Sequence, residues 1–190
     1  KKHPSVATHI VWKLVSDRSI EASDHLPSSR TFELVSPILS GEAGLTECNQ
    51  MVKALTDISA IQVNKSMGFH VHINVKELSV AELVKVCQAF VQYEGVMDTF
   101  MPPSPRSGSK ESRKYFQSHQ TICLESLEAC RTMDQLCDVM NPNKGRYYKL
   151  NLQNLKTGRQ PTLEFRQHPA TSDADLVLSW VRLCMSFVYN

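Results

Sequence analysis

The sequence predicts an α+β domain, in which an antiparallel-rich sheet carries helices on its apolar face and a polar, concave face on the other side. Several short segments alternate apolar and polar residues, which is typical of strands with one buried face, whereas buried parallel strands are continuously apolar. Other segments repeat apolar residues every three or four positions, as amphipathic helices do. Of the 190 residues 42% are hydrophobic, and no repeat or linker divides them, so we expect one domain over residues 1–190.

The predicted strands are short, and polar turns separate them. The clearest is "GFHVHINV" (68–75), where the apolar residues face one way and His70, His72 and Asn74 face the other. The other predicted strands are 8–15 (THIVWKLV), 30–36 (RTFELVS), 147–153 (YYKLNLQ) and 162–168 (TLEFRQH). The turn "NLKTGRQP" separates the last two, which predicts a hairpin.

Helices are predicted where apolar residues recur at helical spacing. The first covers residues 42–58, and a capping box of Ser79 and Glu82 opens the second, which runs to about Asp98. Thr132 and Gln135 cap another, and a strongly amphipathic helix runs from about Asp173 to the end. The Pro- and Ser-rich residues 101–115 are predicted to form a loop.

Composition and charge exclude several classes of protein. The net charge is +2 and the basic residues are scattered, which gives no support for nucleic-acid binding. No segment reaches the roughly 18 apolar residues of a membrane span, and the first residues lack a signal-peptide core. The six cysteines are interpreted as small buried hydrophobes in a reducing compartment, so a cytoplasmic location is expected. Three disulfides in a secreted protein are the alternative.

The polar faces of the predicted strands carry chemically useful side chains. If the strands share one sheet, these side chains line one surface with carboxylates, imidazoles and cations. Carboxylates and imidazoles can bind a divalent metal, and Arg and Lys can bind phosphate oxygens. This mixture fits phosphoryl chemistry with bound metal. The residues are Glu33, His70, His72, Asn74, Lys149, Asn151, Glu164, Arg166 and His168.

Each of these patterns also has a purely structural interpretation. A His-x-His strand is more often a hydrogen-bonded pair than a metal site, and Glu-x-Arg on a strand is usually a surface salt bridge. Arginines in a loop, such as Arg106 and Arg113, are more often solvated than functional. The sequence has no GxxxxGK[ST] phosphate loop and no GxSxG nucleophile motif.

Several motifs in order resemble those of one enzyme family. "NKSMGFHVHINV" (64–75) resembles the glutamine-synthetase signature, and "PTLEFRQH" (161–168) resembles the late Glu-x-Arg strand of that superfamily. "FELVSPILSGEAG" (32–44) resembles the Glu-x-x-Ser-Pro strand and turn of the amidoligase family and of glutamate–cysteine ligases. "DRSI", "YYKLNL" and "TSDADLVLSWVRLC" also resemble this amidoligase family, which is frequent in fungi. The likeness spans about residues 12–187.

This resemblance implies a glutamine-synthetase-like fold and ATP-dependent ligation of a carboxylate to an amine through an acyl-phosphate. The substrates would be an amino acid, peptide or protein carboxylate and an amine, with Mg²⁺ or Mn²⁺ bound among carboxylates and one histidine. Glu33, His70 and Glu164 would bind the metal, with Glu164 counted among the catalytic residues. His72 would contact the ATP phosphates, and Arg166 would neutralise the phosphoryl group. The further candidates for contact with ATP, its phosphates or the substrate are Arg106, Arg113, Arg146, Lys149 and Asn151.

One family feature is missing from the sequence. Members of the family usually open with a Gly-x-Glu-x-Glu strand that supplies metal carboxylates, and no such strand precedes "WKLVSDRSI". We therefore expect either a fragment of a longer protein or a site that lacks ligands. A catalytically incomplete module that binds a ligand or protein partner is the alternative to the ligase. A zinc hydrolase would explain His-x-His but leaves the cations without a role.

Overall fold

The computed structural model describes residues 11–17, 19–21, 31–64, 66–101 and 115–190. It combines helices with small antiparallel sheets, which confirms the predicted α+β class. The chain divides into two compact units. The first contains residues 1–67 and 170–179, and the second contains residues 68–169 and 180–190.

The first unit holds a two-stranded antiparallel sheet and a long helix. Strand β1 (Lys13–Ser16) pairs with β2 (Phe32–Val35), in a register that sets Val15 opposite Glu33. The predicted helix over 42–58 is α1 (Gly41–Thr56). Its Glu47 accepts a 2.7 Å hydrogen bond from the indole of Trp12, which ties the helix to the start of the described chain.

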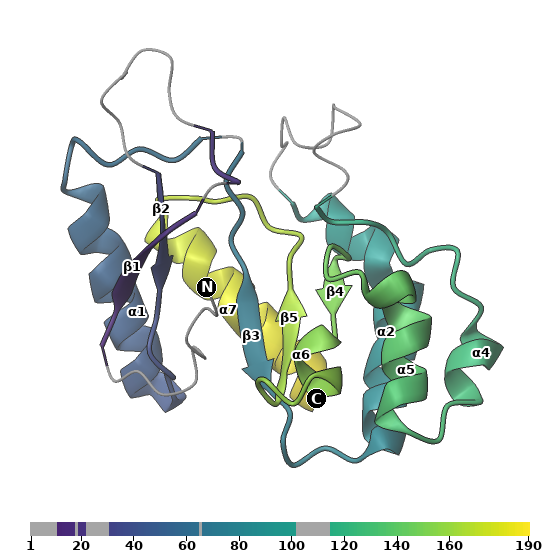
Figure 1. The fold of residues 1–190 in the computed structure, drawn as a ribbon. Helices are drawn as coiled ribbons and strands as arrows, with labels where there is room; N and C mark the ends of the chain where they lie inside the picture. Colours follow the sequence, from purple (N-terminus) through teal and green to yellow (C-terminus); the bar gives the residue numbers. More distant parts are fainter. Residues whose placement is uncertain (1–10, 18, 22–30, 65, 102–114) are drawn as a thin grey trace. The chain divides into compact units, whose positions relative to one another are not determined.

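The second unit holds a three-stranded antiparallel sheet in the order β3-β5-β4 (Figure 1). Its strands are β3 (Val71–Asn74), β4 (Leu150–Asn151) and β5 (Thr162–Phe165). The expectation of a single sheet is therefore corrected, because β2 pairs with β1 in a sheet of its own. The backbone partner of a strand is set by contacts distant in sequence, which alternation does not specify.

The predicted hairpin near the C-terminus is confirmed, since β4 and β5 pair in antiparallel fashion. The strand predicted over 147–153 is reduced to two residues, and its predicted last residue instead begins the short helix α6 (Gln153–Lys156). Gly158 follows α6 with a φ of +63°, a left-handed conformation that glycine adopts without a side-chain clash.

Two helices of the second unit begin where the sequence predicts. In α2 (Val80–Thr99), Ser79 and Glu82 form the expected capping box, and the Ser79 N–H donates to Glu82 Oε2 at 2.7 Å. Thr132 and Gln135 form a second capping box at the start of α5 (Met133–Met140). The other helices are α4 (Leu124–Glu128), the short 3-10 helix η3 (Pro142–Lys144) and α7 (Ala174–Tyr189), which begins in the first unit and ends in the second.

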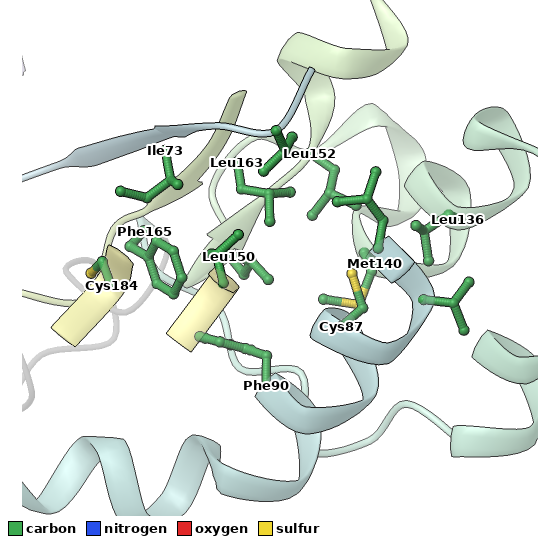
Figure 2. Packing of buried hydrophobic residues seen from close by; sticks show 14 of the residues in the cluster. Ile73, Cys87, Phe90, Leu136, Met140, Leu150, Leu152, Leu163, Phe165 and Cys184 are labelled. Atoms are coloured by element: carbon green, nitrogen blue, oxygen red, sulfur yellow. The ribbon is translucent and has the colours of Figure 1, made fainter. Parts of the chain in front are cut away.

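The core of the second unit lies between the apolar face of its sheet and helices α2, α5 and α7 (Figure 2). The register places Val71, Phe165 and Leu150 in one row across the sheet, and all three are buried. Phe90 of α2 packs edge-on against Phe165, with ring centroids 6.0 Å apart. Burying such aromatic side chains contributes several kcal/mol to folding. The apolar stripe of β3 therefore faces inward, as its alternation predicts.

Five of the six cysteines are buried and the sixth, Cys123, is exposed; all are free thiols. The interpretation as buried hydrophobes therefore fits all but Cys123. Cys123, Cys130 and Cys137, spaced by seven, do not lie on one helix, because α4 and α5 are separate. Among the described residues, no helix is both long and apolar enough to cross a membrane.

Candidate functional site

A row of polar side chains crosses the sheet of the second unit on the face opposite the core. The register sets His72 of β3 opposite Glu164 of β5, and Asn151 of β4 opposite Glu164 from the other side. Directly opposed residues of antiparallel strands place their side chains on the same face. Pairing of three strands thus brings together residues that are up to 92 positions apart in the chain.

Glu164 is the centre of this group, which we call the Glu164 cluster: His70, His72, Asn151, Glu164 and Arg166. Its Oε1 atom lies 3.4 Å from His70 Nδ1 and 3.8 Å from His72 Nε2, and it also accepts from an Arg166 guanidinium N–H. The other oxygen, Oε2, accepts a 2.6 Å hydrogen bond from the Asn151 amide. Glu164 and Asn151 are buried, with 6% and 2% of their surface exposed.

These contacts keep the Glu164 carboxylate charged although it is buried. Burial alone raises the pKa of Glu164, but Arg166, His72 and His70 and the hydrogen bond from Asn151 together outweigh it, so the pKa lies below its ordinary value. A buried carboxylate needs such partners, since an unpaired charge in the interior is costly. Glu164 is therefore an anion at neutral pH.

The two histidines form the open side of the cluster. Their side chains are 26% and 39% exposed for His70 and His72 respectively, against 7% for Glu164. His72 Nδ1 also lies 3.2 Å from the Thr162 hydroxyl and 3.5 Å from the Asn154 amide. Desolvation by the surrounding protein lowers the pKa of His72, and the charges of Arg166 and Arg159 lower it further. The charge of Glu164 acts in the opposite direction and raises it. A ligand can reach these two imidazoles from solvent.

Arg166 lies with its guanidinium between the Glu164 carboxylate and an aromatic ring. One terminal N–H donates to Glu164 Oε1, and the guanidinium carbon lies 5.8 Å from the centroid of the Tyr147 ring. This distance is within the range of a cation–π contact. The Nε atom is buried and has no hydrogen-bond partner in the protein. The side chain thus has unused hydrogen-bonding capacity beside a carboxylate and two imidazoles.

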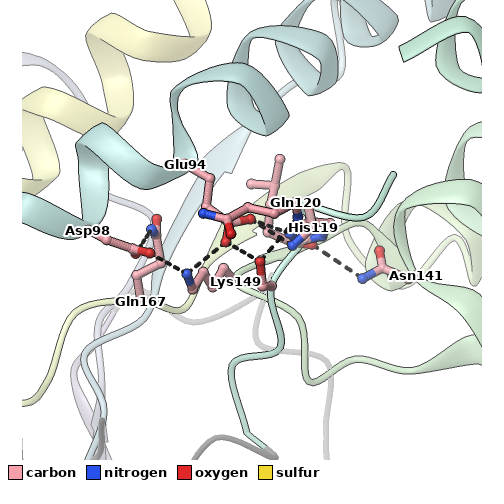
Figure 3. A network of polar contacts seen from close by, with 9 residues as sticks. Glu94, Asp98, His119, Gln120, Asn141, Lys149 and Gln167 are labelled. Carbon is pink, nitrogen blue, oxygen red and sulfur yellow. Dashed lines mark hydrogen bonds and ion pairs between the residues drawn. The ribbon is translucent and has the colours of Figure 1, made fainter. Parts of the chain in front are cut away.

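Lys149 does not join this cluster, although alternation predicts it on the same face as Asn151. Its ammonium instead contacts Glu94 at 2.7 Å and Asp98 at 2.6 Å, both on α2 (Figure 3). The physical reason is that Glu94 is fully buried and requires a cation. Strand β4 begins only at Leu150, so strand alternation does not fix the direction of Lys149.

Four further predicted residues lie in different places. Arg146 is exposed and donates to the Tyr147 hydroxyl at 3.2 Å. Its guanidinium carbon lies 5.1 Å from the centroid of the Tyr147 ring, which Arg166 also contacts. Glu33 is an exposed residue of β2, in the first unit. Arg106 and Arg113 fall outside the described residues. The structure therefore gathers His70, His72, Asn151, Glu164 and Arg166 around one carboxylate, with Arg146 at the edge.

The described residues do not form a ready metal centre. No group of three or more His, Cys, Asp and Glu side chains in the described ranges is arranged to hold a metal ion. In the Glu164 cluster the carboxylate oxygens are directed at Arg166 and Asn151, and only two imidazoles accompany them. The cluster by itself fits the binding of an anion better than the binding of a bare cation.

Sequence reasoning missed two parts of this region. Tyr147, whose ring contacts both arginines, gave no signal beyond its place in an alternating strand. Glu94 did give one, because it stands in the buried stripe of α2 between Phe90 and Met97. A carboxylate at a core position of a helix almost always has a charged partner. That rule predicts a buried cation, although it does not say which one.

Comparison with known proteins gives one match. The sequence model of the family described as "putative amidoligase enzyme" matches residues 2–188, which is nearly the whole chain. Neither the curated proteins nor the solved structures gave a match.

Proposed function

The chain belongs to the amidoligase family, and we propose that it joins a carboxylate to an amine at the expense of ATP, with the reaction centred on the Glu164 cluster. Membership of the family supports a ligase-type function. The observation that carries the location is the convergence of Arg166, His70 and His72 on one carboxylate from neighbouring strands. Two accessible imidazoles beside a guanidinium suit the binding of phosphate oxygens.

In the proposed reaction, a carboxylate oxygen of the substrate attacks the γ-phosphorus of ATP, and ADP leaves. The resulting acyl-phosphate is attacked at its carbonyl carbon by the nitrogen of the amine. Inorganic phosphate then leaves, a proton is lost from nitrogen, and an amide remains. Both steps pass through states with charge on phosphoryl oxygens, which positioned cations stabilise.

Each residue of the cluster has a defined part in this proposal. Arg166 contacts the transferring phosphoryl group through N–H groups that Glu164 does not use. His72, the more exposed imidazole, contacts phosphate oxygens. His70 is the imidazole paired most closely with Glu164, at 3.4 Å. Glu164 fixes the orientation of the guanidinium, and Asn151 fixes that of Glu164.

We propose Mg²⁺ or Mn²⁺ as the companion of the nucleotide rather than as a resident ion. Mg²⁺ commonly keeps several waters and binds through one or two carboxylates plus substrate phosphates. His70 and Glu164 are the candidates in the second unit, and the part of Glu33 stays a prediction from the sequence. Such an ion would neutralise phosphate charge.

The test is ATP consumption by the full chain, followed as release of ADP and phosphate with a panel of carboxylates and amines in Mg²⁺, Mn²⁺ or EDTA. We expect turnover that requires both substrates, and loss of it in His70→Ala and Glu164→Gln. Exposed Arg182→Ala on α7 is the control that keeps parental turnover. Turnover by Glu164→Gln at the parental rate would contradict the proposed location.

A binding module is the second candidate, and one observation favours it. Both oxygens of Glu164 already have partners in the protein, so the cluster is electrostatically satisfied without a ligand. Calorimetry with ATP and Mg²⁺ separates the two candidates. Binding without turnover across the whole panel favours the module, and turnover favours the ligase.

A further inference from the structure

Lys149 lies at the centre of a buried polar network, which we call the Glu94 network: Glu94, Asp98, Ser118, His119, Lys149 and Gln167 (Figure 3). Its ammonium is shared by Glu94 and Asp98, which are one turn apart on α2. The residue is only 9% exposed. Two carboxylates beside one ammonium leave the local field negative, which disfavours the approach of phosphate.

The backbone of Lys149 connects this network to the candidate site. Its carbonyl oxygen accepts from the N–H of Arg166 at 2.8 Å, and its own N–H donates to the Gln117 carbonyl at 3.0 Å. The Gln117 N–H in turn donates to the Tyr147 carbonyl at 2.7 Å. The same residue therefore holds the backbone of Arg166 and the segment that carries Tyr147.

The residue after Arg166 is held by the network as well. The Gln167 amide donates to Asp98 Oδ1 at 3.1 Å, on the carboxylate whose other oxygen contacts Lys149. Arg166 is thus fixed through its own N–H, through its neighbour in sequence, and through the Tyr147 ring under its guanidinium. The first two of these restraints end at Lys149 and at its partner Asp98.

We propose that Lys149 is a positioning residue that acts through Arg166 and Tyr147, and that it does not bind ATP. This proposal builds on the proposed function and replaces the nucleotide contact that the family resemblance implied for Lys149. The contacts of the Lys149 ammonium with α2 hold the chain where β4 begins. They thereby set the orientation of the Arg166 side chain in the Glu164 cluster. Small displacements matter here, since about 1 Å of misplacement can cost on the order of 10²-fold in rate.

The first experiment uses the full chain and needs no activity. The Nε–H signal of Arg166, assigned by its absence in Arg166→Lys, is followed by NMR in Lys149→Met and Asp98→Asn. We expect it to shift and to exchange faster with water in both variants. Lys156→Met is the matched control, because Lys156 forms an exposed ion pair with Asp138 in the same unit. An Arg166 signal that is unchanged in both variants overturns the proposal.

The second experiment separates positioning from ATP binding. In Lys149→Met we expect kcat for ATP consumption to fall about 10²-fold, while Kd for ATP with Mg²⁺, measured by calorimetry, changes less than about 3-fold, under 1 kcal/mol. Lys149→Arg should restore part of the loss in kcat. A rise in Kd comparable to the fall in kcat would instead assign Lys149 to the nucleotide.

Failure of the proposed function is distinguishable from failure of this proposal. If the parent consumes no ATP with any substrate pair, the ligase proposal fails, and the NMR comparison alone decides the role of Lys149. Asp98→Asn guards against a misfolded Lys149→Met, since the Asp98 side chain is 39% exposed and its replacement keeps the shape.

Discussion

Two clusters in the second unit are built from the same chemical parts but differ in access to solvent. In each, a buried glutamate is contacted by a cation and at least one histidine: Arg166 and two histidines at Glu164, and Lys149 and His119 at Glu94. His119 is fully buried, whereas His70 and His72 are 26% and 39% exposed. Glu94 and His119 are therefore closed to ligands, whereas the Glu164 cluster has an open side formed by its two histidines.

The difference teaches that composition alone does not identify a site in this protein. Carboxylate, imidazole and cation occur together twice, and only exposure distinguishes the cluster that a substrate can reach. The two glutamates also differ in what holds their charge. Glu94 accepts from Ser118, the His119 N–H and Lys149, while Glu164 depends mainly on Arg166 and the two histidines. The predictions that follow test this contrast.

The largest expected effect is on stability, at Glu94. In Glu94→Ala the Lys149 ammonium keeps Asp98 as its one carboxylate partner among these contacts. The three hydrogen bonds that Glu94 accepts in the interior are lost. Breaking a buried pair in this way typically costs about 3–5 kcal/mol of unfolding free energy, measured by urea denaturation. Asp138→Ala, which breaks the exposed pair with Lys156, should cost less than about 1 kcal/mol. Equal losses in the two variants would remove the distinction between buried and exposed pairs.

The next effect is on turnover, at Arg166. Removing one electrostatic contact to a transition state typically lowers kcat by about 10²–10³-fold, so Arg166→Ala should do so while Kd for ATP changes modestly. Arg166→Lys should recover only part, because lysine lacks the planar fork of donors. The measurement is steady-state phosphate release alongside calorimetry. Parental turnover in Arg166→Ala would remove Arg166 from the mechanism.

A third effect appears on acidification. Burial raises the pKa of Glu94, but hydrogen bonds from His119, Lys149 and Ser118 outweigh it and lower the pKa to about 2, from an ordinary value of 4.5. Because the folded-state pKa is depressed, Glu94 stabilises the fold above pH 4.5, and this stabilisation is lost as the pH falls toward 2. The loss is on the order of 3 kcal/mol.

Glu94→Gln is the matched variant for this acid dependence. Since glutamine does not titrate, urea unfolding of Glu94→Gln between about pH 5 and about pH 2 should show a flatter profile than the parent. A profile as steep as that of the parent would mean that other carboxylates cause the acid sensitivity.

The smallest expected effect is on the titration of His72. Its pKa lies below the ordinary 6.5 through desolvation, and Glu164 opposes that shift. Glu164→Gln should therefore lower the His72 pKa further, as measured by the pH dependence of its ring NMR signals. A rise in the pKa would show that Glu164 is not the dominant charge beside His72.

Much of the local structure follows from short-range signals in the sequence. The capping boxes at Ser79 and Thr132 join residues three positions apart, and the alternation in β3 directs Val71 inward and His72 outward without information from elsewhere in the chain. Even the surprising Glu94 carries a local signal, a charge in an apolar helical stripe. These features depend on helix and strand periodicity, which the sequence displays directly.

The sequence by itself therefore determined the α+β class, the starts of the main helices and the polar face that carries His70, His72, Glu164 and Arg166. Tertiary structure alone decided that β2 pairs with β1 rather than with the strands of the second unit. It also decided that the Lys149 ammonium contacts Glu94 of α2. Strand partners and buried ion pairs join residues tens of positions apart, and each forms only where burial makes an unpaired hydrogen-bonding group or charge costly. That cost depends on the whole fold, so no local pattern could have assigned Lys149 to Glu94 or Tyr147 to Arg166.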